Sequence, residues 1–119
     1  MAAPVHFVVD LAINEGKLDA FQAIANDMIA RTRNEAGALA YEWYLSADQR
    51  RCRVFEIYQD VDAVNAHLNG YAVRELIPKL VEHVKLDRFE VYGNPGPEAA
   101  ASLKSFGAEI FSLWQGLGR

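Results

Sequence analysis

The chain of 119 residues has the length of a single domain, and its composition, 51% hydrophobic and 24% charged, is that of an ordinary folded protein. Twelve basic residues against sixteen acidic ones give a net charge of −4, which argues against a nucleic-acid partner because phosphate binding needs a basic surface. The single cysteine, Cys52, excludes a disulfide framework and a cysteine-rich zinc site.

The sequence carries no recognisable targeting signal. Residues 1–10 lack a positively charged region, and their apolar run is interrupted at His6 and ends at Asp10. No stretch approaches the roughly 20 apolar residues needed to span a bilayer. We therefore expect a cytoplasmic protein with no membrane partner.

The first half of the chain predicts a strand, a helix and a hairpin. Residues 6–13 alternate between apolar and mixed positions, as in a half-buried strand. Apolar residues at three- and four-residue steps over 17–33 indicate an amphipathic helix, and Gly37 follows its end. Two further alternating segments, 38–46 and 52–58, are joined by a polar loop and predict a pair of hairpin strands.

The second half predicts a helical region, a strand and an extension. Asp60 or Asp62 can cap a short helix that ends near Gly70, and a second apolar stripe over 71–84 contains Pro78, which should kink or break it. A strand follows over 86–92. The run Gly-Asn-Pro-Gly-Pro at 93–97 then breaks the regular structure.

We assign residues 1–93 to the domain and residues 94–119 to a C-terminal arm. The arm favours a helix over 98–106 and an added strand over 108–114. Its large apolar residues, among them Phe111 and Trp114, indicate that it packs on its own domain or on a partner subunit. It would act there as a structural clasp or as a cover for a pocket.

The order strand, helix, strand, strand, helix, strand predicts an α+β fold of the ferredoxin-like βαββαβ type. We expect a four-stranded antiparallel sheet with both helices on one face, followed by the C-terminal extension. The alternation assigns to this inner face Phe7, Val9, Leu11, Ile13, Leu39, Tyr41, Trp43, Leu45, Phe55, Ile57, Phe89 and Val91. The outer face then carries His6, Val8, Asp10, Glu42, Tyr44, Val54, Glu56, Tyr58, Arg88, Glu90 and Tyr92.

Three tyrosines among the charges of the predicted outer face indicate a protein surface rather than a merely solvated one. We therefore expect a homodimer joined sheet to sheet through the side of Tyr44, Tyr58 and Tyr92.

Common catalytic motifs are missing from the sequence. The three histidines, His6, His67 and His83, fall on different elements without metal-ligand spacing, so we expect no metal site. No serine lies in a G-x-S-x-G motif, and Cys52 has no evident base. Glycine-rich phosphate-binding loops are absent as well, so we expect no nucleotide cofactor.

A group of aromatic residues around one histidine remains as the candidate site. Tyr41 and Trp43 project from the helix side of the second strand, His67 lies at the edge of an apolar helix stripe, and Tyr71 and Arg74 follow. Together they would line a flat, mostly apolar slot for a small aromatic molecule. The alternative is a filled core in which the aromatic rings only pack.

Three segments resemble the antibiotic biosynthesis monooxygenase domain family, which includes quinol monooxygenase-like proteins: 37–44, 54–60 and 63–68. The resemblance extends over about residues 5 to 93. Its most specific part is the pattern of Tyr58, Asp60, Ala63 and His67. The resemblance implies a dimeric α+β barrel.

It also implies oxygenation of phenolic or quinol substrates without metal, flavin or haem. His67 would be the catalytic base, Tyr41, Trp43 and Tyr71 would orient the substrate ring, and Arg74 would stabilise its anion. Some relatives degrade haem with an inward asparagine on the first strand, which this chain lacks. Others are isomerases, and a non-catalytic ligand-binding or stress-response dimer is a further alternative.

Overall fold

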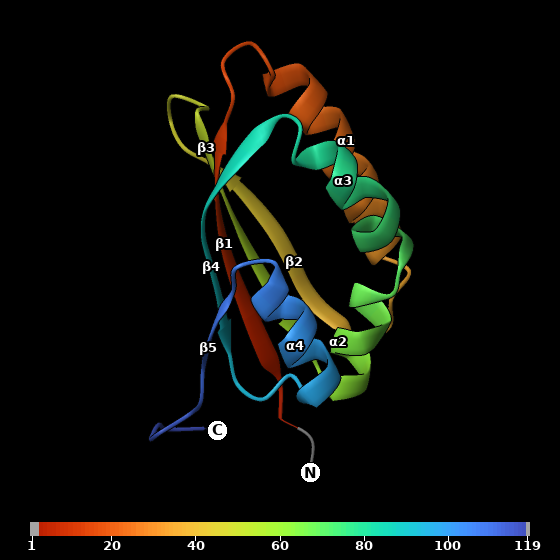
Figure 1. Cartoon of the computed structure of the whole chain (residues 1–119), viewed down its shortest axis with the longest axis vertical. Helices are drawn as coiled ribbons and strands as arrows, with labels where there is room; N and C mark the ends of the chain where they lie inside the picture. Colours follow the sequence, from red (N-terminus) through yellow and green to blue (C-terminus); the bar gives the residue numbers. More distant parts are fainter. Residues whose placement is uncertain (1–2, 119) are drawn as a thin grey trace.

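A computed structural model describes residues 3–118. Its sheet contains five strands, with helices packed on one side only (Figure 1). The strands are β1 (Val5–Ile13), β2 (Ala38–Leu45), β3 (Arg51–Tyr58), β4 (Val84–Tyr92) and β5 (Glu109–Phe111), in the order β2-β3-β1-β4-β5. The helical elements are α1 (Leu18–Thr32), α2 (Val61–Leu68), the π-helical segment η1 (Ala72–Leu76), α3 (Ile77–Leu80) and α4 (Pro97–Ser105).

The predicted α+β ferredoxin-like arrangement is confirmed, but the sheet is larger than expected. Strands β1 to β4 pair antiparallel with one another, whereas β5 of the C-terminal extension pairs parallel to β4. Gly107 has φ +90°, a conformation that favours glycine, and it lies in the turn that leads from α4 into β5. The sheet is therefore mixed and five-stranded rather than antiparallel and four-stranded.

The assignment of faces along β3 was wrong. Val54 pairs with Val9 and Glu56 with Phe7, and directly paired residues of neighbouring strands share a face. Cys52, Val54, Glu56 and Tyr58 are therefore buried under the helices, while Phe55 is half-exposed on the outer face and Ile57 lies beside it. Leu39 was also misplaced: it is the extra residue of a β-bulge and is 60% exposed.

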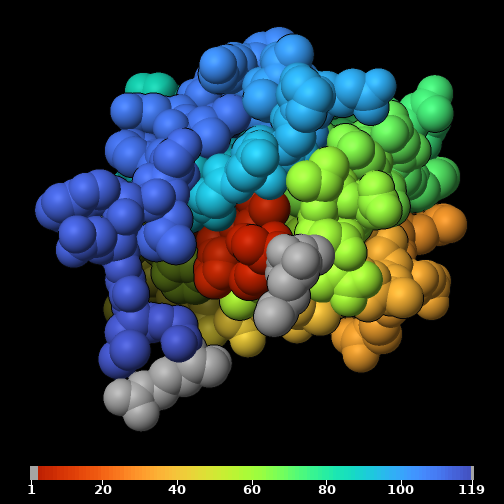
Figure 2. Space-filling model, turned by 90° about the horizontal axis from the view of Figure 1, so that it is seen from below, coloured from red at the N-terminus to blue at the C-terminus, as the bar shows by residue number. Residues whose placement is uncertain are grey.

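The C-terminal arm packs on its own domain as far as β5. Helix α4 lies beside α2, as Figures 1 and 2 both show, and buries Ala99 and Leu103 against a cluster that includes Val5, Tyr58 and Val64. A second cluster joins α1, η1 and α3 to the other end of the sheet. No helix among residues 3–118 is long and apolar enough to cross a membrane.

Candidate functional site

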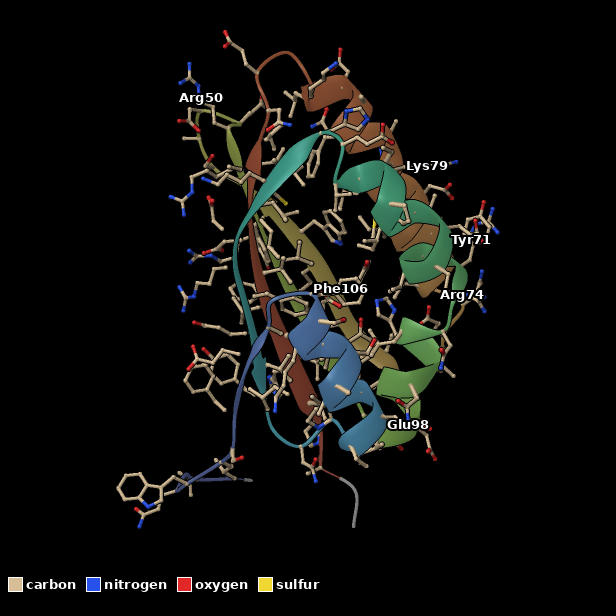
Figure 3. All side chains as sticks on the ribbon, viewed as in Figure 1. Arg50, Tyr71, Arg74, Lys79, Glu98 and Phe106 are labelled. Atoms are coloured by element: carbon tan, nitrogen blue, oxygen red, sulfur yellow. The ribbon has the colours of Figure 1, made fainter. Side chains whose placement is uncertain are left out.

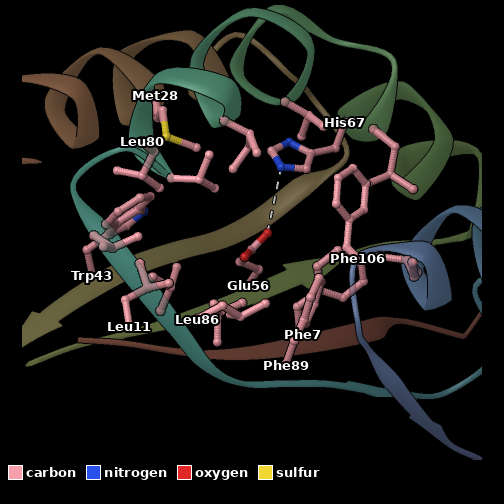
Figure 4. A pocket seen from close by; sticks show the side chains of 18 residues that line it. Phe7, Leu11, Met28, Trp43, Glu56, His67, Leu80, Leu86, Phe89 and Phe106 are labelled. Carbon is pink, nitrogen blue, oxygen red and sulfur yellow. Dashed lines mark ion pairs between the residues drawn. The ribbon is translucent and has the colours of Figure 1, made fainter. Parts of the chain in front are cut away.

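A cavity of about 230 Å³ lies where the two core clusters meet, between the helices and the inner face of the sheet (Figure 4). Its walls are almost entirely apolar: Leu11, Met28, Trp43 and Leu80 line one part, and Phe7, Phe89 and Leu103 line another. Such a chamber with few polar groups is typical of a small-molecule site.

Two polar side chains, Glu56 and His67, converge on this cavity, and both are buried. Their side chains point toward each other in Figure 4, with His67 Nε2 at 3.7 Å from Glu56 Oε1. The other ring nitrogen, Nδ1, is 2.9 Å from Oε1 of Glu35, outside the cavity lining. The imidazole thus lies between two carboxyl groups, one of them facing the cavity.

Local sequence features fix His67 in this place. Of the two predicted capping residues, Asp60 and Asp62, Asp60 caps α2: its side chain accepts a hydrogen bond from the Ala63 amide at 2.8 Å. Helix α2 therefore has a defined start two turns before His67. A Cβ at Gly37 would lie 2.5 Å from Ala63 Cβ. Glycine is therefore needed for the turn that carries Glu35 to pack against α2.

The surroundings of Glu56 favour its uncharged form. Burial raises the pKa of Glu56, while the nearby His67 imidazole and a hydrogen bond from Tyr58 act in the opposite direction. The Tyr58 hydroxyl donates to Glu56 Oε1 at 2.5 Å, and burial holds the pKa of Tyr58 well above its ordinary value. Burial likewise raises the pKa of Tyr41. Both phenols therefore stay protonated near neutral pH and are not available as bases.

The structure brings together three of the five residues that the sequence nominated. His67 and Trp43 line the cavity, and the ring of Tyr41 packs against His67 with 5.4 Å between ring centres. Tyr71 and Arg74 point away from the cavity on the outer surface of the helices (Figure 3). Tyr71 packs there under the guanidinium group of Arg31, 4.0 Å from its ring centre.

Sequence reasoning missed both carboxyl groups. Glu56 was assigned to the outer face together with Val54 and Tyr58, and no function was assigned to Glu35. A signal for Glu56 was present, because a lone acidic residue between Val54 and Tyr58 interrupts an otherwise apolar alternation. Nothing in the sequence pairs Glu35 with His67, since 32 positions separate them.

Within residues 3–118, no group of three or more histidine, cysteine, aspartate or glutamate side chains is arranged to bind a metal ion. No lysine or arginine from these residues lines the cavity either. The site thus offers proton donors and acceptors at one point and apolar surface elsewhere.

Comparison with known proteins assigns the family. The model of the antibiotic biosynthesis monooxygenase family matches residues 4–79, so the chain belongs to that family. MupZ from Pseudomonas fluorescens is 26% identical with a TM-score of 0.77, over 98% of this chain and 95% of MupZ. No curated protein sequence matches the chain.

Two further solved structures share the fold. Rv0793 from Mycobacterium tuberculosis is 24% identical with a TM-score of 0.67, over 80% of this chain and 98% of Rv0793. A protein from Caulobacter crescentus, provisionally assigned as an antibiotic biosynthesis monooxygenase, is 20% identical with a TM-score of 0.67, over 76% of this chain and 86% of that protein. At these identities the likeness establishes the fold alone.

The side chains of Leu86 and Phe106 line the cavity and are half-exposed, so we infer that the cavity opens to solvent beside them. We predict that Leu86→Trp closes it and weakens binding of a neutral apolar fluorescent probe, N-phenyl-1-naphthylamine, about tenfold or more, which corresponds to about 1.4 kcal/mol. Titration of probe fluorescence measures the effect. Leu39→Trp, at an exposed position that does not line the cavity, is the matched control. If the two variants bound the probe with equal affinity, the probe would bind outside this cavity and the prediction would be wrong.

Proposed function

We propose that the cavity is the active site of a cofactor-independent monooxygenase acting on small, neutral phenolic or quinol substrates. The observation that carries the proposal is the convergence of His67 and Glu56 on one point of an otherwise apolar chamber. Membership of the antibiotic biosynthesis monooxygenase family supports an oxygenase. The apolar walls suit a flat aromatic ring.

The chemistry begins with removal of a phenolic proton. A free phenol has a pKa near 10, so it needs a base to react at neutral pH. His67 accepts this proton at Nε2, while Glu56 hydrogen-bonds the substrate oxygen. The 3.7 Å between these two groups exceeds a hydrogen-bond length, which leaves Nε2 of His67 available to a substrate hydroxyl. Oε1 of Glu56 already accepts a hydrogen bond from Tyr58, so Glu56 would engage the substrate through its other oxygen, Oε2.

The resulting phenolate can reduce O₂ without an added reductant. One electron passes to O₂, and the phenoxyl radical and superoxide combine to form a C–O bond on the ring. The proton held by His67 returns to the hydroperoxide, the O–O bond breaks, and loss of the ring hydrogen gives a quinone and water. Phenol plus O₂ thus equals quinone plus water, and all four electrons come from the substrate. The apolar walls exclude water from the intermediates.

An oxygen electrode tests this proposal. Purified protein is mixed with a panel of hydroquinones, naphthols and anthrones, and O₂ uptake is followed together with incorporation of ¹⁸O from labelled O₂ into the product. Uptake above the uncatalysed rate, with one labelled oxygen atom in the product, supports the monooxygenase. Absence of both for the whole panel contradicts it.

A second candidate function is favoured by the pairing of an acid with a base. Burial raises the pKa of Glu56 and favours its acid form, while His67 presents a nitrogen that can accept a proton. This pair can move a proton between two positions of a substrate, as in an isomerase, with no oxidant. Anaerobic exchange of substrate carbon-bound hydrogen with deuterated water would distinguish this reaction, because the oxygenase product requires O₂.

We also propose that two copies pair through the outer face of the sheet. No helix from residues 3–118 covers this face, and it carries half-exposed Tyr44, Phe55, Tyr92 and Phe111. Tyr58, which we expected there, is instead buried under the helices. On the same face, Arg53 forms two hydrogen bonds with Asp10, so these two charges are already paired within one chain.

We predict that Phe55→Asp weakens this dimer about tenfold or more, because an unpaired carboxylate in an apolar contact is costly. Sedimentation velocity over a concentration series measures the dissociation constant. Tyr71→Asp, at an exposed aromatic on the helix side, is the control. A wild-type chain that sediments as a monomer at all concentrations would refute the pairing.

A further inference from the structure

We propose that Glu35 is a positioning residue that holds His67 in the tautomer with hydrogen on Nδ1, so that the lone pair of Nε2 faces the cavity. The inference rests on the proposed function in taking His67 as the base. Neither the sequence pattern nor the family match gives Glu35 a role.

The contact between these residues is close and shielded. Glu35 Oε1 lies 2.9 Å from His67 Nδ1, and the two side chains are 18% and 4% exposed. Hydrogen bonds to a charged group that are shielded from water are stronger than exposed ones. This geometry lets the carboxylate fix the orientation of the ring.

The direction of the hydrogen bond follows from the chemistry of the two groups. A carboxylate can only accept, so Nδ1 must donate. In a neutral imidazole the other nitrogen then carries no hydrogen and accepts. That nitrogen, Nε2, is the one that faces Glu56 and the cavity. In the same way, the carboxylate of a hydrolytic triad orients the histidine, and the histidine acts as base toward the reacting group.

Other groups around His67 do not compete for Nδ1. Glu56 faces the opposite nitrogen, and Tyr58, whose ring centre is 4.9 Å from that of His67, donates its hydroxyl to Glu56. Tyr41 packs its ring against the edge of the imidazole. Among residues 3–118, Glu35 is the hydrogen-bond partner of Nδ1.

The Glu35 carboxylate is not needed to build the turn that carries it. The backbone of Glu35 is held by its own hydrogen bonds, from its amide to Thr32 O at 2.9 Å and from the Ala38 amide to its carbonyl at 3.1 Å. The side chain instead reaches toward the C-terminal end of α2, where a Cβ at Gly70, two residues beyond the helix, would lie 3.3 Å from Oε2. A change in the side-chain head group therefore leaves the turn intact.

Glu35→Gln tests the proposal. The amide keeps the shape but offers both a donor and an acceptor to Nδ1, so neither tautomer is fixed. We expect kcat to fall about 10²-fold with KM little changed, less than the roughly 10⁴-fold that the comparable change causes in serine proteases, because Glu35 is partly exposed. Glu98→Gln, on the outer side of α4, is the matched control (Figure 3).

A spectroscopic measurement separates this proposal from the proposed function. The ¹⁵N resonances of the His67 ring report which nitrogen carries the hydrogen, with or without turnover. We expect the Nδ1–H form in the wild type and a mixture of tautomers in Glu35→Gln. An Nε2–H form in the wild type, or the same tautomer in both proteins, would overturn the positioning role. A change of tautomer without any O₂ uptake would refute the oxygenase and leave the role of Glu35 standing.

Discussion

Replacing His67 with alanine is expected to lower kcat for the phenolic substrate about 10²- to 10⁴-fold, the usual contribution of a positioned general base. The remaining carboxyl group, Glu56, is not expected to take over, because a carboxylate is ordinarily a weaker base than an imidazole and Tyr58 already donates a hydrogen bond to it. Initial rates of O₂ uptake at saturating substrate measure the loss. KM should change less, since the apolar walls that hold the ring are untouched.

A loss of activity in His67→Ala has to be distinguished from a loss of folding, because His67 is buried between two carboxyl groups. His67→Gln keeps most of the volume and a polar head, and it should lose turnover to the same extent while melting close to the wild type. His6→Ala removes an exposed histidine from the outer face and should retain full activity. Turnover by either His67 variant at the wild-type rate would remove His67 from the mechanism.

The order of the helices and strands, and the choice of His67 as a candidate site residue, could be predicted from the sequence because both depend on local patterns. Alternation and three- to four-residue periodicity placed the first four strands and α1 within a few residues of their observed ends. Asp60 and Asp62 both indicated the start of α2, and the apolar stripe of that helix placed His67 at its edge. The inward direction of Tyr41 and Trp43 followed from the same alternation.

The carboxyl groups were not accessible because they depend on register and on distant contacts. In β3, Phe55 and Ile57 are as apolar as Val54 and Tyr58, so alternation alone does not choose between the two faces. Pairing with β1 decides it, since Glu56 lies opposite Phe7. A buried glutamate next to a histidine is a departure from the hydrophobic pattern, and such departures are expected at functional sites.

The positions of Tyr71 and Arg74 were mistaken for a related reason. We extrapolated a single α-helical stripe from Tyr71, but residues 72–76 form a π-helical segment with wider i→i+5 hydrogen bonding. The segment buries Ala72 and Leu76 and leaves Tyr71 and Arg74 exposed. A change of helix type of this kind alters which residues face the sheet, and the sequence gives no local mark of it apart from Pro78 in the following helix.

Leu103→Ala is expected to lower the free energy of unfolding by about 2–5 kcal/mol, the cost of truncating a fully buried leucine. Leu103 is completely buried, packs in the cluster of Val5, Tyr58 and Val64, and also lines the cavity. The C-terminal arm therefore belongs to the core as far as α4 and β5. Urea unfolding followed by circular dichroism measures the change, and Ser102→Ala, exposed on the same helix, should stay within about 0.5 kcal/mol of the wild type.

The segment after β5 should behave differently. Leu113, Trp114 and Leu117 are 83%, 88% and 79% exposed, so deleting residues 112–119 should change the stability of the monomer by less than about 0.5 kcal/mol. A loss as large as that of Leu103→Ala would mean that this segment is buried in solution. If the loss appears only at high protein concentration, the segment packs against a second copy, because association stabilises the folded chain by mass action.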